Sequence, residues 1–130
     1  MIIHEINTPV REVMMDITNI VDSEIEKCGV RDGSCIVFVP HTTAGITLNE
    51  NADPDVKCDI MLSLREMIPD IRFKHVEGNS DAHIKASLIG SSVNLIIENG
   101  KLALGTWQGI FFCEFDGPRK RKIYIKIVKS

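Results

Sequence analysis

Three of the four histidines lie in two polar segments, where they could transfer protons or bind a metal ion. An imidazole changes its charge near neutral pH, and the neutral ring is a common metal ligand. The first segment runs from His41 through Thr42 and Thr43 to Asn49 and Glu50. A carboxylate can fix the tautomer of a histidine by accepting its ring N–H. The carboxylates in or beside the two segments are Glu50, Asp53, Glu77 and Asp81.

The second polar segment covers residues 75–83 and holds His75, Asn79, Asp81 and His83. Its two histidines are eight residues apart, which is not the spacing of a helical zinc-binding pair. The polar side chains between them could equally serve as caps and turn residues at the start of a short helix over residues 82–89. The residues alone leave both the chemical and the structural interpretation open.

Two further segments offer side chains that could bind a substrate. Trp107, the only tryptophan, and Gln108 lie between glycines, so the indole could cover a ring-shaped substrate or simply close one end of the fold. Arg119 and Arg121 follow a Gly-Pro turn, and their guanidinium groups could hold a phosphate through paired hydrogen bonds. A charged, solvated hairpin tip is equally consistent with this basic run.

Composition excludes several other classes of protein. The 130 residues carry a net charge of -3, which does not indicate a nucleic-acid-binding surface. The four cysteines form no CxxC pair, so they do not predict a zinc ribbon or a redox motif. The apolar runs are far shorter than the roughly 20 residues that span a bilayer. We therefore expect one domain over residues 1–130, no membrane segment, no export signal and a cytoplasmic location.

Two long helices are predicted from apolar side chains that recur every three or four residues. The first is expected over residues 10–28, with Thr8 and Pro9 at its start and Gly29 after its end. The second is expected to begin at Asp53-Pro54 and to end before Pro69. These helices, with the short one over 82–89, would position the polar segments that follow or precede them.

The rest of the chain is predicted to form strands joined by turns. Asn99-Gly100 is typical of a type I′ hairpin, and Asp116-Gly117-Pro118 predicts a longer hairpin between the last two strands. Because hairpin partners run antiparallel, the expected fold is α+β, an antiparallel β-sandwich with two long helices and one short helix. The expected strands are Ile2 to Ile6, Cys35 to Val39, Thr47 to Leu48 with their neighbours, Val93 to Glu98, Lys101 to Leu104, Ile110 to Phe115 and Lys122 to Val128.

Three groups of these residues together resemble the YjbQ family of secondary thiamine-phosphate synthase-like proteins. They are His41-Thr42-Thr43-Ala44 with Asn49-Glu50, the stretch from His75 through Asn79-Ser80-Asp81-Ala82-His83 to Leu88, and Gly105-Thr106-Trp107-Gln108-Gly109-Ile110. The resemblance covers essentially the whole chain. It implies a jelly-roll-like β-sandwich that forms homotrimers with sites near the subunit boundaries.

The resemblance also implies an activity, a weak thiamine-phosphate synthase reaction. This reaction joins a pyrimidine diphosphate to a thiazole phosphate and releases pyrophosphate. The implied catalytic residues are His41, Asn49, Glu50, His75, Asn79, Asp81 and His83. Trp107 and Gln108 are also implied, and we group them with Thr42, Thr43, Arg119 and Arg121 as candidate residues for binding the substrate.

Three functional hypotheses follow, each with a small phosphorylated metabolite or another small ligand as the partner. In the first, an enzyme of this type, a divalent Mg²⁺ or Zn²⁺ held by His41, His75 and His83 would stabilise the departing pyrophosphate. The chain has no Gly-rich phosphate loop and no paired aspartates for Mg²⁺, which favours weak activity. The second hypothesis is a metal-dependent hydrolase with the same ligands and Glu50 or Glu77 as base. The third is a non-catalytic protein that binds a small ligand at a trimer interface.

Overall fold

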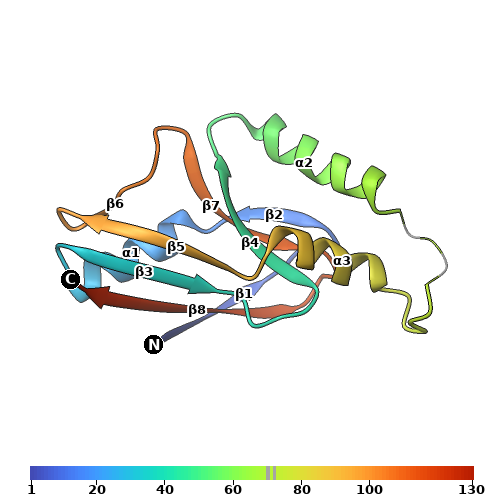
Figure 1. Ribbon diagram of the computed structural model, residues 1–130, viewed down its shortest axis with the longest axis horizontal. Coiled ribbons are helices and arrows are strands. Elements are labelled where there is room, and N and C mark those ends of the chain that lie inside the picture. The colour runs from blue at the N-terminus through green and yellow to red at the C-terminus, as the bar shows by residue number, and fades with distance from the viewer. Residues whose placement is uncertain (70, 72) are drawn as a thin grey trace.

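Figure 1 shows a computed structural model of the chain, built from two antiparallel sheets and helices packed against them. The structure describes residues 1–69, 71 and 73–130. The strands in this part of the chain are β1 Ile2–Asn7, β2 Val13–Asp16, β3 Gly33–Phe38, β4 Ala44–Glu50, β5 Ser92–Glu98, β6 Lys101–Leu102, β7 Gln108–Glu114 and β8 Lys120–Lys129. The helices are α1 Thr18–Cys28, α2 Pro54–Met67 and α3 Ser80–Ile89. The predicted α+β class with antiparallel sheets is confirmed.

The larger sheet has five strands in the order β1-β8-β3-β5-β6. Alternate side chains of each strand point into the core, as the period of two in their sequences predicted. Val37 of β3 pairs with Ile125 of β8, and both side chains are fully buried. The opposite face of the same strands carries Phe38 and Tyr124, whose rings stack with their centroids 6.1 Å apart.

The smaller sheet has three strands in the order β2-β7-β4. Ile110 and Phe112 on one face of β7 belong to the core that this sheet shares with the larger one. Phe111 and Cys113 on the other face pack against apolar side chains of α2 and α3, namely Met61, Leu64, Ala82 and Ala86. A strand covered on both faces has a continuous apolar sequence, which is why β7 shows no alternation.

The helix predicted over residues 10–28 is wrong in its first half. Helix α1 begins only at Thr18, and Val13–Asp16 forms β2, which pairs antiparallel with β7. The apolar side chain of Met14 fits either geometry, but β7 provides an open edge for backbone hydrogen bonds and Met14 packs against Cys113 beside it. Asp16 helps to start the helix, since its Oδ1 accepts the Thr18 N–H at 2.9 Å. The predicted end is confirmed, with Gly29 at a positive φ of 72°.

The hairpin predicted at Asp116-Gly117-Pro118 is also wrong. This turn connects β7 to β8, but the two strands lie in different sheets. Within each sheet, both edges of each of these strands are already occupied, those of β7 by β2 and β4 and those of β8 by β1 and β3. The turn therefore carries the chain from one sheet to the other.

The hairpin predicted at Asn99-Gly100 is confirmed. Both residues have positive φ, 54° and 77°, as a type I′ turn requires. Glu98 pairs with Lys101 across the turn, and Ile97 pairs with Leu102.

Gly100→Ala is expected to lower the free energy of unfolding by about 1 kcal/mol, because a Cβ strains a residue at positive φ. The added methyl group would also lie 3.1 Å from the Arg31 guanidinium. Urea unfolding followed by circular dichroism measures the change. Asn99→Gly serves as the control and should be close to neutral, and equal losses for the two variants would contradict the proposed cause.

Helices α2 and α3 cover the outer face of the three-stranded sheet. The prediction for α2 is confirmed: Asp53 caps it by accepting the Asp55 N–H at 2.9 Å, and Pro54 occupies its first turn. Helix α3 begins two residues before the expected 82–89, directly after Asn79. In the described part of the chain, no helix is long and apolar enough to cross a membrane.

Candidate functional site

A cavity of about 470 Å³, here called the histidine pocket, lies beside the end of the β3–β4 connection. Three segments that are distant in the sequence form it: residues 40–43 before β4, residues 75–83 around the start of α3, and the beginning of β8. The pocket is lined by Pro40, His41, Thr42, Thr43, His75, Glu77, Asn79, His83, Arg119 and Arg121. The fold thus brings together most of the predicted site residues.

His41 is held in one tautomer by the backbone of β8. Its Nε2 accepts the Lys122 N–H at 2.9 Å, so the proton of the neutral ring must lie on Nδ1. Burial and the positive charge of Arg121 lower the pKa of His41 below its ordinary value. His41 therefore enters the pocket as a neutral imidazole whose Nδ1–H is able to donate.

A nuclear magnetic resonance titration is expected to show His41 with a pKa below 6.5 and with its neutral proton on Nδ1. As the pH falls, His41 is protonated at a higher pH in the unfolded chain than in the folded chain. Acidification below pH 6.5 should therefore reduce the free energy of unfolding. The ¹⁵N shifts of the ring nitrogens report the tautomer directly. A pKa above 6.5, or a proton on Nε2, would contradict this description.

His75 and His83 form an edge-to-face pair in the same pocket. Their ring centroids are 5.5 Å apart and their planes are inclined by 84°. The Nε2 of His75 lies 3.9 Å from Oε1 of Glu77, a side chain that is 72% exposed. Helix α3 supplies His83, and the loop before the helix supplies His75.

Arg121 is buried in an ion pair with Glu114 and is not free to neutralise a ligand. Its Nε donates to Oε1 of Glu114 at 2.9 Å, and its Nη2 donates to Oε2 and, at 2.8 Å, to Oγ1 of Thr43. Thr8 donates to Glu114 as well, at 2.7 Å. Burial alone would raise the pKa of Glu114, but Arg121 and Thr8 together lower it. Arg121 and Thr43 therefore fasten the segment that carries His41 to β8.

Arg119 and Asn79 meet at Asp116 on the rim of the pocket. The Asp116 Oδ2 accepts from Nη2 of Arg119 at 3.0 Å and from Nδ2 of Asn79 at 2.8 Å. Arg119 stays half exposed, so its guanidinium can reach a ligand. The Oδ1 of Asn79 is buried and has no hydrogen-bond partner among the described residues. This oxygen is an available acceptor in the wall of the pocket.

Asp81 lies outside the pocket in a buried ionic network. Its carboxylate accepts from Nη2 of Arg11 at 3.1 and 3.2 Å and from Nζ of Lys85 at 3.3 Å. Lys85, only 1% exposed, also donates to Glu12 at 2.9 Å. Burial opposes the ionisation of Asp81, but Arg11 and Lys85 outweigh it and lower its pKa. This network was not predicted from the sequence, although Lys85 follows Asp81 at the i,i+4 spacing of helical ion pairs.

The remaining predicted residues lie at the other end of the β4–β7 pair. Ala44 pairs with Glu114 near the histidine pocket, whereas Glu50 pairs with Gln108 at the far end. A strand of this length separates the two ends by about 20 Å. We call the far end, with Asn49, Glu50, Trp107 and Gln108, the tryptophan end. Figure 1 shows it where the loop before β7 approaches the end of β4.

The tryptophan end is exposed, and both backbone and side-chain hydrogen bonds hold it. Trp107 is 62% exposed, and its carbonyl oxygen accepts the Asn51 N–H at 3.0 Å. Oδ1 of Asn49 accepts the Glu50 N–H at 2.7 Å, and Oε1 of Gln108 accepts the Gly105 N–H at 2.9 Å. Within one chain, Trp107 cannot stack on a ligand in the histidine pocket.

The predicted ligands do not fit a metal centre within one chain. Among the residues that the structure describes, no three His, Cys, Asp or Glu side chains gather closely enough to hold an ion. The Nε2 of His41 is also already engaged with the Lys122 N–H.

The chain belongs to the YjbQ family. The family model described as UPF0047 protein YjbQ-like matches residues 3–130. A UPF0047 protein of Methanocaldococcus jannaschii is 57% identical over 126 residues, which are 96% of this chain and 91% of that protein. The UPF0047 protein YugU of Bacillus subtilis is 51% identical over 126 residues, 95% of this chain and 96% of its own.

Solved structures of the same family have the same fold. A crystal structure of an uncharacterised YjbQ/UPF0047 family protein from Clostridium acetobutylicum superimposes with a TM-score of 0.96 at 58% identity. The match covers 98% of this chain and all of the other. A YbjQ-like protein of unknown function from Sulfolobus solfataricus gives a TM-score of 0.93 at 35% identity, covering 98% of this chain and 95% of its own.

Proposed function

We propose that the histidine pocket binds the phosphorylated end of a small metabolite and that the chain is an enzyme of the secondary thiamine-phosphate synthase type. The observation that carries this proposal is a single cavity lined by three imidazoles with a reachable guanidinium on its rim. The neutral Nδ1–H of His41, the hydroxyl of Thr42 and Arg119 are donors suited to phosphate oxygens. The family resemblance supplies the reaction.

In this reaction the bond between the pyrimidine methylene carbon and its diphosphate oxygen breaks, and the thiazole nitrogen forms a C–N bond to that carbon. The electron pair of the broken bond leaves with pyrophosphate. Fixed donors that face the departing oxygens stabilise this charge without reorganising. His41 meets that requirement, because the backbone of β8 fixes its tautomer and ring position. The exposure of Arg119 and the engagement of the buried Arg121 with Glu114 fit weak catalysis.

We propose further that the site is completed across the subunit boundary of a homotrimer. The support is the separation within one chain of the histidine pocket and the tryptophan end, which carry residues of one family pattern. Trp107 of a neighbouring subunit could then cover the pyrimidine or thiazole ring. We also propose a jelly-roll-like sandwich, which the core shared by both sheets supports, and a cytoplasmic location.

The direct test supplies the pure protein with the pyrimidine diphosphate and the thiazole phosphate and measures thiamine phosphate. The expected result is product formation that falls to background in the double variant His41→Ala, His83→Ala. His4→Ala is the matched control and should keep the activity, since His4 lies on β1 and pairs with Glu24 at 3.0 Å. Equal product from the double variant and the unchanged protein would overturn the proposal.

Mixing two inactive variants tests the shared site. His83→Ala removes one imidazole from the histidine pocket, and Trp107→Ala removes the indole from the tryptophan end. Each variant alone should therefore be inactive. Random mixed trimers should regain about a quarter of the full activity, because one boundary in four pairs two intact halves. A mixture of His41→Ala with His83→Ala, both in the same half, should regain none. Failure of the first mixture, or a monomer mass in solution, would contradict the shared site.

A non-catalytic binding protein is the second candidate. The observation that favours it is that, among the described residues that line the pocket, the only carboxylate is Glu77, which is 72% exposed and therefore a poor base. Thermal shifts with either phosphate compound, without turnover of the pair, would support this candidate over the enzyme. A metal-dependent hydrolase has no comparable support, since its ligand set does not assemble in the described chain.

A further inference from the structure

A second cavity, of about 590 Å³, opens between helix α1 and the β5–β6 hairpin. It lies at the other end of β3 from His41, so it is separate from the histidine pocket. Its floor is apolar: Ile25 is 2% exposed, and Leu102 and Leu104 pack against the main core. A volume of this size suits a small molecule.

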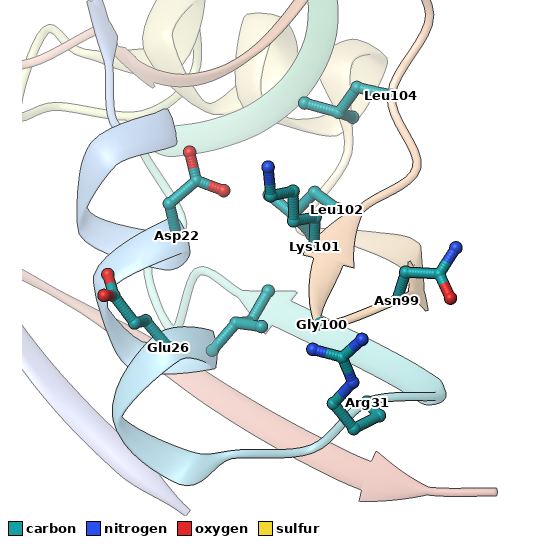
Figure 2. A pocket seen from close by; sticks show the side chains of 9 residues that line it. Asp22, Glu26, Arg31, Asn99, Gly100, Lys101, Leu102 and Leu104 are labelled. Atoms are coloured by element: carbon teal, nitrogen blue, oxygen red, sulfur yellow. The ribbon is translucent and has the colours of Figure 1, made fainter.

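The two walls of this cavity carry opposite charges. Helix α1 contributes Asp22 and Glu26, which are four residues apart and share one face of the helix. The opposite wall contributes Lys101 from β6 and Arg31 from the turn before β3. Figure 2 shows Asp22 and Lys101 pointing into the opening from the two sides. In the part of the chain that the structure describes, no ion pair within 4.0 Å joins these walls.

The backbone holds the walls in place. The Gly100 N–H donates to the carbonyl oxygen of Arg31 at 2.8 Å, which ties the hairpin to the turn after α1. The type I′ turn at Asn99-Gly100 leaves no Cβ on Gly100, so the Arg31 guanidinium packs close against it. The charged groups therefore stand on fixed elements rather than on a long loop.

The acidic wall also carries an electrostatic cost that a bound cation would relieve. Two carboxylates at i and i+4 on a helix repel each other. Burial and the neighbouring Asp16 raise the pKa of Asp22, so a positive charge placed beside it would favour its charged form. A simple cation would meet repulsion from Arg31 and Lys101, and a simple anion would meet it from α1. Only a molecule with both charges satisfies both walls.

We propose that this cavity binds a small zwitterion with an ammonium group at Asp22 and Glu26, a carboxylate at Arg31 and Lys101, and an apolar chain between them. Ile25 and Leu102 contact the chain. The guanidinium of Arg31 suits a carboxylate because it can donate two parallel hydrogen bonds.

The test uses 6-aminohexanoate as the probe, with hexanoate and hexylamine as analogues that each keep one charge. Titrations are followed by the amide shifts of α1 and of the β5–β6 hairpin. We expect 6-aminohexanoate to bind about 10-fold more tightly than either analogue, since each wall adds a modest exposed ion pair. Asp22→Asn with Glu26→Gln, and separately Lys101→Gln, should each remove most of this advantage.

Asp59→Asn on α2 and Lys126→Gln on β8 are the matched controls, because they change exposed charges away from the cavity. Both should leave the preference for 6-aminohexanoate unchanged. The proposal is overturned if the zwitterion binds no better than its analogues, if the shifts fall outside α1 and the hairpin, or if the control variants reduce binding as much as the wall variants. Unfolding curves of all variants establish that each one is folded.

Discussion

Glu114→Gln is expected to lower the free energy of unfolding by about 3–5 kcal/mol, because it leaves the charge of Arg121 buried without its counter-ion. Arg121 is 3% exposed and Glu114 is fully buried, so water cannot replace the lost carboxylate. The glutamine has nearly the same shape, which excludes a packing defect as the cause. Urea unfolding at pH 7, followed by far-ultraviolet circular dichroism, measures the loss.

A double variant separates the unpaired charge from the lost hydrogen bonds. Glu114→Leu with Arg121→Met removes both charges, and a buried pair replaced in this way commonly costs little. Thr8, Thr43 and two backbone N–H groups would still lose a partner, so we expect the double variant to recover about half of the loss. A single variant that costs less than about 1 kcal/mol would contradict the role given to this pair.

The same pair predicts a dependence on pH. The folded-state pKa of Glu114 lies below the ordinary 4.5, so its contribution is fully present above pH 4.5 and is lost as the pH falls through the folded value. The difference in stability between the unchanged protein and Glu114→Gln should therefore shrink on acidification below pH 4.5. A difference that stays constant down to the acid transition would show that the carboxylate charge is not its source.

Lys85→Met is expected to lower the free energy of unfolding by about 2–4 kcal/mol. Lys85 is 1% exposed and is the buried cation between Asp81 and Glu12. Methionine fills similar space but removes the buried cation, so Asp81 keeps the more exposed Arg11 as a partner and Glu12 keeps Arg11 and Arg65, both at 3.8 Å. Because Asp81 and Lys85 lie on α3, the variant should also loosen the helix that carries His83.

Arg11→Met is the matched control for this network. The Arg11 side chain is 42% exposed, so water can take over much of its interaction with Asp81. We expect it to cost about 1 kcal/mol or less under the same conditions. Amide exchange along α3 should increase in Lys85→Met and stay nearly unchanged in Arg11→Met. The reverse order of stabilities would show that burial does not control the strength of this network.

Helices and strands could be predicted from the sequence where the spacing of apolar residues or a turn motif fitted only one kind of element. Alternation in β8 and the Asn99-Gly100 turn were sufficient, as were the cap and first turn of α2 at Asp53-Pro54. The start of α1 could not be predicted in this way, because Val13 and Met14 fit both a helix and a strand. The strand forms because β7, which is distant in the sequence, offers a free edge with which Val13 and Met14 can pair.

The candidate site was predicted in composition but not in arrangement. The polar segments singled out in the sequence supply His41, His75 and His83, and the structure places all three around one pocket. An aspartate can act as a catalytic acid, and Asp81 was among the predicted catalytic residues. In the structure its carboxylate is instead buried in an ion pair with Arg11, which lies seventy residues away along the chain. Trp107 is separated from the histidines by the length of β4, a distance that residue spacing does not reveal.

The central position of β7 has a consequence for how the protein can respond to a ligand. Both of its edges and both of its faces are covered, so it can neither bend nor slide without disrupting two cores at once. Binding at either end of the β4–β7 pair must therefore be accommodated by side chains and terminal loops. In an assembly that uses both ends, the rigid strand would hold the two boundaries of each subunit at one fixed spacing.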